Sequence, residues 1–393
     1  MRNTFFDLRQ MMKNGKGSRR VAIVMSEEFV RRLSPSLSHF VRRQLDFRIL
    51  SIRRSRSELR NALKEMDPIG LVTEWLPGIT DFLIGLGYPT VIADSDAPFA
   101  TGAVVDVDDW EVGREAARYF LRSGHKRFGF LGNLFPYSEQ RRAGFFEIIE
   151  EEGYSVNCFV EEEPIGKGYF EDVWEPREDL LRWLEALPKP TAVFAAHDPL
   201  GRILCEACRE LGVRVPDDLA VVGANDDPLI CDLSFPSLSS VRIPWDRIGI
   251  AVGEAINRLL EGQSGLQAIS IAPGGVQVRQ SSDTFQVDDP LLRRAYVWLN
   301  QHHREPIGIA DLCSSLRISR RTLERKFGEF FRKTPYQALS EMRVETARRL
   351  LVETNEPMPL VAELAGFGDA ERLSVVFRRV TGRRPSDFRN RTG

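Results

Sequence analysis

The sequence predicts an α/β domain of two lobes, each built on a doubly wound parallel sheet, followed by an all-α domain with two helix-turn-helix units. Three observations support this fold class. Short β-branched runs alternate with amphipathic helical patterns from residue 20 to about residue 285. About eleven strand candidates lie in that part, more than one sheet usually holds. The last hundred residues show helical periodicity alone, and they contain a repeat.

The strand candidates are short and apolar, and helical patterns separate them. They read RVAIVM, DFRILSI, IGLVTEW, PTVIAD, RFGFLG, TAVFAAH and LAVVGAN. The helical patterns between them include Asp108 to Gly124, and several end at a glycine that suits a helix C-cap. Strands that alternate with helices in this way indicate parallel sheets covered by helices.

Composition changes after residue 285. The segment GGVQVRQSSDTFQVDDP is polar and reads as a last strand followed by a linker. From Asp288 onward the chain has 20 Lys and Arg against 14 Asp and Glu, whereas the whole chain has 54 against 56. We therefore expect an N-terminal extension at 1–19, a first domain at 20–285 and a second, basic domain at 286–393.

The basic domain contains the same pattern twice, fifty residues apart. Ser319 and Asp369 are potential N-caps, and each is followed by two apolar residues at i+4 and i+8 and then by a proline. The first set continues with Leu323, Phe327 and Pro335, and the second with Leu373, Phe377 and Pro385. A long amphipathic pattern between the two sets predicts a helix that holds two helix-turn-helix units at a fixed separation.

Other features of the sequence narrow the class of protein. No run approaches the roughly 18 to 20 apolar residues of a membrane span, and the first twenty residues lack the apolar core of a signal peptide, so we expect a cytoplasmic protein. Cys205 and Cys208 form a C-x-x-C inside a helical pattern, and packing is the favoured interpretation because no second ligand pair follows. No nucleophile elbow, P-loop or spaced metal-ligand set is present, so we expect neither an enzyme, nor a cofactor, nor a metal site.

From about Pro290 to Arg389 the chain resembles the AraC/XylS family of DNA-binding domains. The resemblance rests on IADLCSSLRISRRTLERKF, on Arg343 to Leu351, and on the final LVAELAGFGDAERLSVVFRRVTGRRPSDFR. It implies seven helices, with recognition helices at Arg320 to Phe331 and Ala370 to Val380 that enter successive major grooves of double-stranded DNA. The N-terminal residues of such helices reach base edges, and their cations neutralise phosphates.

The candidate DNA-binding residues fall into two groups. Those expected at or near base edges are Arg320, Arg321, Glu324, Arg325, Glu371, Arg372 and Ser374. Those expected on phosphates are Lys326, Lys333, Arg378, Arg379, Arg383 and Arg384. For any one of these residues a solvated charged face is the alternative interpretation.

The preceding part resembles the effector domain of the LacI/GalR family, which has the fold of periplasmic sugar-binding proteins. The resemblance rests on HKRFGFLG and SEQRRAGF, then on TAVFAAHD, VRVPDDLAVVGANDD and PSLSSVRIPWDRIG. It implies two lobes that close on a ligand at the carboxyl ends of their strands. Arg141 takes the place of the family's sugar-binding arginine. The other candidate ligand residues follow predicted strands or supply an aromatic face for a sugar ring; they are Glu74, Trp75, Asp94, Trp174, His197, Asp198, Asn225 and Asp226.

The two resemblances together imply a sugar-responsive transcriptional regulator, with D-xylose or a similar pentose as effector. A homodimer on its DNA operator and a contact with RNA polymerase are further expectations, and activation is the favoured direction of control. Two alternatives stay open. The same architecture responds to another monosaccharide, a sugar phosphate or a nucleobase, or the protein binds a sugar without regulating DNA.

Overall fold

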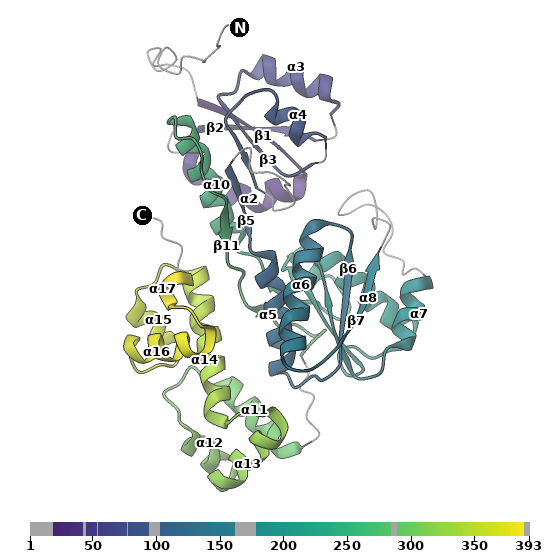
Figure 1. The fold of residues 1–393 in the computed structure, drawn as a ribbon, viewed down its shortest axis with the longest axis vertical. Coiled ribbons are helices and arrows are strands. Elements are labelled where there is room, and N and C mark those ends of the chain that lie inside the picture. Colours follow the sequence, from purple (N-terminus) through teal and green to yellow (C-terminus); the bar gives the residue numbers. More distant parts are fainter. Residues whose placement is uncertain are drawn as a thin grey trace. The chain divides into compact units, whose positions relative to one another are not determined.

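The computed structural model describes residues 19–41, 45–52, 54–76, 78–93, 103–161, 178–283 and 289–388. Two of the predicted ligand residues, Asp94 and Trp174, lie outside these ranges. The chain forms two compact units (Figure 1). The first unit comprises Met1–Asp106 and Trp245–Ser270, and the second comprises Val107–Pro244 and Ile271–Gly393.

The first unit contains a six-stranded sheet in the order β11-β5-β4-β3-β1-β2. Its strands are β1 (Arg19–Met25), β2 (Leu45–Ser51), β3 (Gly70–Thr73), β4 (Thr90–Ile92), β5 (Ala103–Val107) and β11 (Ile269–Ile271). The pairs β1–β2, β1–β3, β3–β4 and β4–β5 are parallel. The fully buried side chains of β1 and β3 explain why these segments read as continuous apolar runs.

In the part of the chain that the structure describes, helices cover this first sheet (Figure 1). They are α2 (Glu27–Val41), α3 (Arg56–Met66), α4 (Thr80–Ile84) and α10 (Trp245–Leu260). Leu59, Leu63 and Leu83 of α3 and α4 pack against one face of the sheet. On the other face α2 and α10 approach each other closely, because a Cβ at Gly253 would meet the ring of Phe40 at 2.2 Å.

The second unit begins with another six-stranded sheet, in the order β12-β10-β9-β8-β6-β7. Its strands are β6 (Phe128–Asn133), β7 (Val156–Glu161), β8 (Thr191–Ala195), β9 (Leu219–Asn225), β10 (Ser239–Arg242) and β12 (Val276–Gln277). Only β12 is antiparallel to its neighbour among the strand pairs of this sheet that the structure describes. The two predicted parallel sheets are thereby confirmed.

The helices of this sheet are α5 (Asp109–Arg122), α6 (Pro136–Glu151), α7 (Glu178–Ala186), α8 (Asp198–Glu210) and the short α9 (Pro228–Cys231). On the α5 and α6 side, Phe145 packs against Phe130 and Phe194 of the sheet. On the α8 side, Cys205 and Cys208 are buried, and burial raises the pKa of both thiols, to about 12 for Cys208. The C-x-x-C pair therefore packs in the core.

Seven helices complete the second unit, as the resemblance implies. They are α11 (Pro290–His302), α12 (Ile309–Leu316), α13 (Arg320–Phe331), α14 (Pro335–Glu353), α15 (Met358–Leu364), α16 (Ala370–Thr381) and α17 (Pro385–Phe388). No strand occurs in residues 289–388. Among the described parts of the chain, no helix is long and apolar enough to cross a bilayer.

The strand predictions are correct for β1 to β4, β6, β8 and β9, and all of these except the edge strand β2 are mostly buried. The quoted runs omit β5, β7, β10 and β11. These strands lie toward the sheet margins, and β7 has exposed residues where a central strand has apolar ones. The predicted boundary near residue 287 falls on residues 284–288, outside the described ranges.

Candidate effector and DNA-binding sites

Arg141 lies on α6 at the carboxyl edge of the second sheet, and it is 5% exposed. Its Nε donates a hydrogen bond to Asp109 Oδ1 at 2.7 Å. Its Nη1 donates to the carbonyl oxygen of Ala196 at 2.7 Å and to Asn225 Oδ1 at 3.3 Å. These contacts fix the guanidinium plane at the ends of β8 and β9, where the sequence predicts the sugar to bind.

Backbone strain occurs at the same edge. Asn225 ends β9 with φ 118°, and Asp226 follows with φ 53°. Such angles disfavour side chains with a Cβ, and they cluster at sites where the surrounding structure holds them for a function. Both residues were predicted from the sequence as ligands, and the structure places Asn225 against Arg141.

Asp198 and Asp226 are not presented in the same way as Asn225. Asp198 is fully buried at the start of α8, and its carboxylate accepts hydrogen bonds from Ser240 Oγ and from the Asp227 backbone. The Asp226 carboxylate pairs with Arg279 at 2.7 Å. Burial raises the pKa of Asp226, although Arg279 opposes it. Both carboxylates thus have protein partners and support the strained turn.

Aromatic side chains at this edge were missed in the sequence. Tyr137 lies on the first turn of α6, with its ring under the Arg141 guanidinium at 4.9 Å and 5.8 Å from the ring of His197. Phe135 stacks on Tyr137 at 5.9 Å and is 48% exposed. An exposed aromatic face beside fixed donors suits the apolar face of a sugar. The segment LFPY directly after the predicted strand is the signal that could have identified these rings.

In the first unit, Glu74 follows β3 and is 5% exposed. Its carboxylate accepts hydrogen bonds from the Ser26 backbone at 2.5 Å and from Ser26 Oγ at 3.0 Å. Burial raises the pKa of Glu74, and the Ser26 hydrogen bonds oppose that rise. Trp75 is half-buried next to it. The ends of β1 and β3 therefore bring together one carboxylate, one hydroxyl and one indole.

The predicted repeat of the C-terminal domain corresponds to two structural units. The N-caps Ser319 and Asp369 accept hydrogen bonds from Thr322 and Arg372 backbone amides. The four apolar repeat residues are fully buried; they are Leu323, Phe327, Leu373 and Phe377. Each set lies in its own apolar cluster. Helices α13 and α16 thus begin and pack alike, and both prolines start a following helix.

Most of the candidate DNA-binding side chains are exposed. The exposed ones are Arg320, Arg321, Arg325, Glu371, Arg372, Ser374, Arg378, Arg379 and Arg383, and the half-buried ones are Glu324, Lys326 and Lys333. On α13, Arg320 pairs with Glu324 and Arg325 with Glu329, both one helical turn apart. Exposed pairs of this kind contribute little free energy, so DNA can replace the carboxylates at low cost.

Two of the predicted phosphate contacts have protein partners in less exposed places. Lys326 pairs with Asp289, the N-cap of α11. Lys333 pairs with Glu341 of α14 at 2.7 Å. By contrast, Arg321, Arg378 and Arg379 have no carboxylate within ion-pair distance among the described residues. These arginines are the better candidates for contacts with DNA.

Arg343 of the long helix α14 ties this helix to the chain segment that follows α11. It is 6% exposed, and its guanidinium donates to the carbonyl oxygens of His303, Glu305 and Ile307 at 2.8 to 2.9 Å. Those carbonyls follow α11, so α14 cannot turn relative to α11 without breaking three hydrogen bonds. The helix is therefore a firm spacer between α13 and α16, as the sequence predicts.

Comparisons with known families match two separate parts of the chain. Residues 117–282 match a periplasmic binding protein-like domain, and residues 312–391 match a helix-turn-helix domain. A solved structure of a xylose-binding transcription activator superposes with a TM-score of 0.58 at 22% identity, and the match covers 94% of this chain and 97% of that one. A cellobiose complex of a transcriptional regulator superposes with a TM-score of 0.55 at 21% identity, over 70% and 89% of the chains.

The fold and the two domain matches define a transcriptional regulator in which a periplasmic binding protein-like domain precedes a helix-turn-helix domain. Within that class, the chain is homologous to xylose operon regulatory proteins. It is 28% identical to the one from Haemophilus influenzae over 72% of this chain and 74% of the relative. It is 25% identical to the one from Escherichia coli strain K12, over 78% of each.

Proposed function

We propose that this regulator activates transcription of sugar-utilisation genes in response to D-xylose or a closely similar pentose. One observation carries the proposal: a sugar-type site on the second sheet and a duplicated helix-turn-helix domain occur in one chain, in the order and over most of the length of xylose operon regulatory proteins. A protein with this role works in the cytoplasm, where its DNA is.

For the effector, we propose that Arg141 donates hydrogen bonds to adjacent sugar hydroxyls while Asn225 accepts one. Fixed donors lose little entropy when a ligand binds, and the contacts of Arg141 with Asp109 and Ala196 fix its guanidinium. Phe135 and Tyr137 would cover the apolar face of the ring. Asp198 and Asp226 would support the site without contacting the sugar, because their hydrogen bonds and ion pair fix the turn that follows Asn225.

The remaining predicted ligand residues stay proposals for sugar contacts. His197 caps α8 beside Tyr137 and is partly exposed. Glu74 and Trp75 lie at the carboxyl edge of the first sheet, and Asp94 and Trp174 complete the set.

For DNA, we propose that α13 and α16 read base edges while exposed arginines neutralise phosphates. Arg320, Arg321, Glu324 and Arg325 would do this on α13, and Glu371, Arg372 and Ser374 on α16. Arg378, Arg379 and Arg383 would bind phosphates, with Lys326 and Lys333 as weaker candidates because of their protein partners. A homodimer would bring four such units to one operator, and the second reader would then bind at high effective concentration. Contact with RNA polymerase is the proposed route to activation.

A thermal-shift screen of monosaccharides, sugar phosphates and nucleobases tests the effector. A ligand that binds only the folded state must raise the melting temperature, by mass action. D-xylose should raise it and should change the affinity of the protein for operator DNA. If pentoses leave the melting temperature unchanged while another compound raises it, the effector assignment is wrong. If no compound alters DNA affinity, the regulatory function is wrong.

A further inference from the structure

Helix α5 begins at the proposed effector site. Its first residue, Asp109, is 2% exposed and accepts the hydrogen bond from Arg141 Nε at 2.7 Å. Asp108 caps the helix by accepting a hydrogen bond from the Glu111 backbone at 3.0 Å. A sugar that forms hydrogen bonds with Arg141 therefore contacts a guanidinium that is itself hydrogen-bonded to the first residue of α5.

Helices α5 and α6 pack backbone against backbone. A Cβ at Gly113 of α5 would lie 1.9 Å from the carbonyl oxygen of Arg141. A Cβ at Gly144 of α6 would lie 1.9 Å from the carbonyl oxygen of Trp110. Such contact leaves no room for one helix to slide over the other, because packed interiors resist small displacements. Movement of Arg141 is thereby transferred to α5 as a whole.

Further along, α5 makes a buried ion pair with the DNA-binding domain. Arg348 of α14 donates to Glu115 of α5, and their side chains are 4% and 1% exposed. Arg348 also donates to Glu345 at 3.1 Å and to the carbonyl oxygen of Gly274 at 3.3 Å. A Cβ at Gly275 would lie 2.5 Å from Glu345 Oε1, so the chain after β11 closes over this contact.

The charges around this pair are balanced. Four carboxylates and four guanidinium groups take part: Glu111, Glu115, Glu147, Glu345, Arg114, Arg118, Arg122 and Arg348. Arg118 bonds Glu111 at 2.7 Å and Glu115 at 2.5 Å, and Arg122 lies 3.8 Å from Glu345. Burial opposes ionisation of Glu345, but Arg348 and Arg122 lower its pKa to about 2.

A buried ionic contact of this kind is specific in its geometry. Apolar surfaces can shift by fractions of a turn and stay buried, whereas a buried charge that leaves its partner is left unpaired at high cost. On this argument we expect the contact between α5 and α14 either to be fully formed, as in this structure, or to be broken, with few arrangements in between. Two discrete arrangements are what a transmission element requires.

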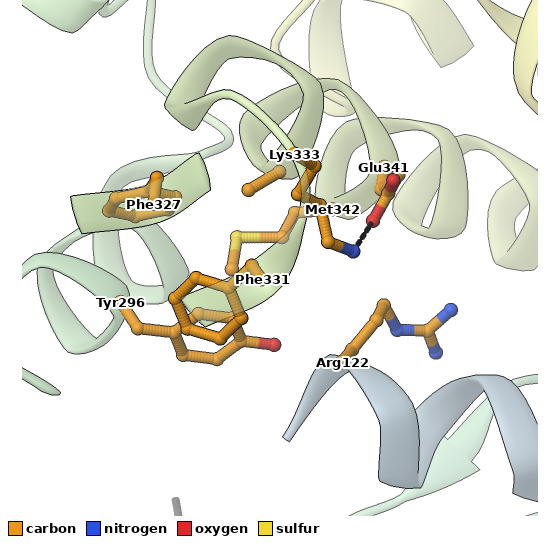
Figure 2. A pocket seen from close by; sticks show the side chains of 8 residues that line it. Arg122, Tyr296, Phe327, Phe331, Lys333, Glu341 and Met342 are labelled. Atoms are coloured by element: carbon orange, nitrogen blue, oxygen red, sulfur yellow. Dashed lines mark hydrogen bonds and ion pairs between the residues drawn. The ribbon is translucent and has the colours of Figure 1, made fainter. Parts of the chain in front are cut away.

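The same end of α5 also meets the first recognition helix. Figure 2 shows Arg122 among side chains of the first helix-turn-helix unit, beside the Lys333–Glu341 ion pair and the rings of Tyr296 and Phe331. Just after α5, Lys126 Nζ lies 4.6 Å from the centre of the Phe330 ring, and Phe330 belongs to α13. Helix α5 and the residues just after it thus contact both the spacer helix α14 and the recognition helix α13.

We propose that α5 transmits the state of the effector site to the DNA-binding domain, with Asp109 as its input residue and the Glu115–Arg348 ion pair as its output contact. The two points lie six residues apart, about 9 Å along the helix axis. The proposal rests on the proposed function, because it requires a sugar at Arg141 and DNA on α13 and α16. Glu115, Arg348 and Asp109 are positioning residues that touch neither ligand.

The test uses the full chain, D-xylose as the probe, and a duplex selected by the wild-type protein from random sequence. Fluorescence anisotropy gives the Kd for DNA with and without saturating D-xylose. The Glu115→Gln/Arg348→Gln double variant removes both charges and leaves neither unpaired. It should keep each separate affinity within about threefold, while the D-xylose effect on DNA affinity falls to within twofold of none. The control is Glu206→Gln/Arg209→Gln, an ion pair on α8 between a half-buried glutamate and an exposed arginine, which should keep the wild-type response.

Asp109→Asn separates transmission from a merely structural interface. Asp109 orients Arg141, so this variant is measured at D-xylose concentrations that saturate it. Under those conditions it should still reduce the D-xylose effect on DNA affinity by at least threefold. Hydrogen exchange gives a second test, on the wild-type protein alone. D-xylose should change the exchange rate of the α14 backbone amides near Arg348 at least fivefold.

The outcomes distinguish the two proposals. A wild-type response that the double variant and Asp109→Asn both retain, or α14 exchange that D-xylose leaves unchanged, would overturn the transmission role alone. A wild-type protein that binds D-xylose with no change in DNA affinity would overturn the proposed function and, with it, the role of α5.

Discussion

The carboxylate of Asp198 holds the backbone of Asp227, whose amide donates to Oδ2 at 2.9 Å. The other oxygen accepts from Ser240 Oγ, and that hydroxyl accepts in turn from the Asp226 amide at 2.9 Å. A single buried side chain at the start of α8 thus fixes the turn after β9, which carries the positive φ angles of Asn225 and Asp226. The geometry of the proposed effector site, at the carboxyl edge of the second sheet, depends on this support.

Replacing Asp198 should therefore cost stability as well as sugar affinity. Asp198→Ala leaves the Asp227 amide and the Ser240 hydroxyl without their partner, and two buried unsatisfied groups cost about 2 to 4 kcal/mol. We expect urea denaturation to give that decrease in the free energy of unfolding, with Asp198→Asn affected less. A change below about 0.5 kcal/mol would mean that the carboxylate does not support the turn.

Arg141 should contribute to sugar affinity beyond any effect on folding. Hydrogen bonds from a charged donor are worth about 1.5 to 3 kcal/mol, so Arg141→Lys should raise the Kd for D-xylose about 10- to 150-fold. Isothermal titration calorimetry measures this change. Arg142→Lys is the matched control, because Arg142 is the next residue on α6 and forms an ion pair with Glu139. Equal losses in both variants would contradict the assignment.

More of the DNA-binding domain than of the effector site could be predicted from the sequence. The two units follow from local rules: an N-cap, apolar residues at i+4 and i+8, and a helix stop place α13 and α16 to within a residue. Ser319 and Asp369 cap their helices as expected. Each such rule involves neighbours within one or two helical turns, which the sequence displays directly.

The effector edge depends on contacts between distant residues, and these were beyond sequence reasoning. Arg279 neutralises Asp226 from 53 residues away, and Asp109 orients Arg141 from 32 residues away. In the sequence, an aspartate at the end of a strand looks the same whether it binds a ligand or lies buried beneath the binding site. The sequence therefore predicts Asp198 as a ligand residue without showing its hydrogen bonds to Ser240 and Asp227, and it gives no sign of the contact between Asp109 and Arg141.

The carboxylate of Glu74 should lower the stability of the fold at pH 7 while contributing to D-xylose binding. Burial raises its pKa above the ordinary 4.5, so the folded protein holds this proton more tightly than the unfolded chain does. Stability therefore falls as pH rises from 4.5 through the raised pKa, and at pH 7 the ionised group carries a cost. Glu74→Gln should raise the melting temperature at pH 7 and weaken D-xylose binding. A lower melting temperature at pH 7 would show that the charge stabilises the fold.

His125 should make the protein sensitive to acid. It is 4% exposed next to Phe120, and burial lowers its pKa to about 4 from 6.5. Between these values the unfolded chain binds a proton that the folded protein does not, so stability falls as pH drops from 6.5 to 4. The loss amounts to about 3 kcal/mol. His125→Phe should remove that part of the pH dependence in denaturation curves. The control His302→Gln, at a half-buried histidine beside Glu305, should not.

The last prediction separates base reading from phosphate binding on the two recognition helices. Arg321 is exposed near the start of α13 and has no carboxylate within ion-pair distance among the described residues. Arg321→Ala should relax discrimination at one base position, at a cost of about 1 to 3 kcal/mol on the specific sequence. Arg379 lies in the last turn of α16, away from the helix start that reaches base edges. Arg379→Ala should weaken binding to all sequences alike.

Salt titrations of the two variants decide between the roles. A residue that neutralises one phosphate releases about one counterion, so Arg379→Ala should lower the slope of log Kd against log salt by about 1. Arg321→Ala should leave the affinity for random DNA nearly unchanged, because a base contact is lost only where the matching base is present. Equal losses on specific and random DNA for both variants would place Arg321 on the backbone and would leave the reading of sequence to other side chains of α13 and α16.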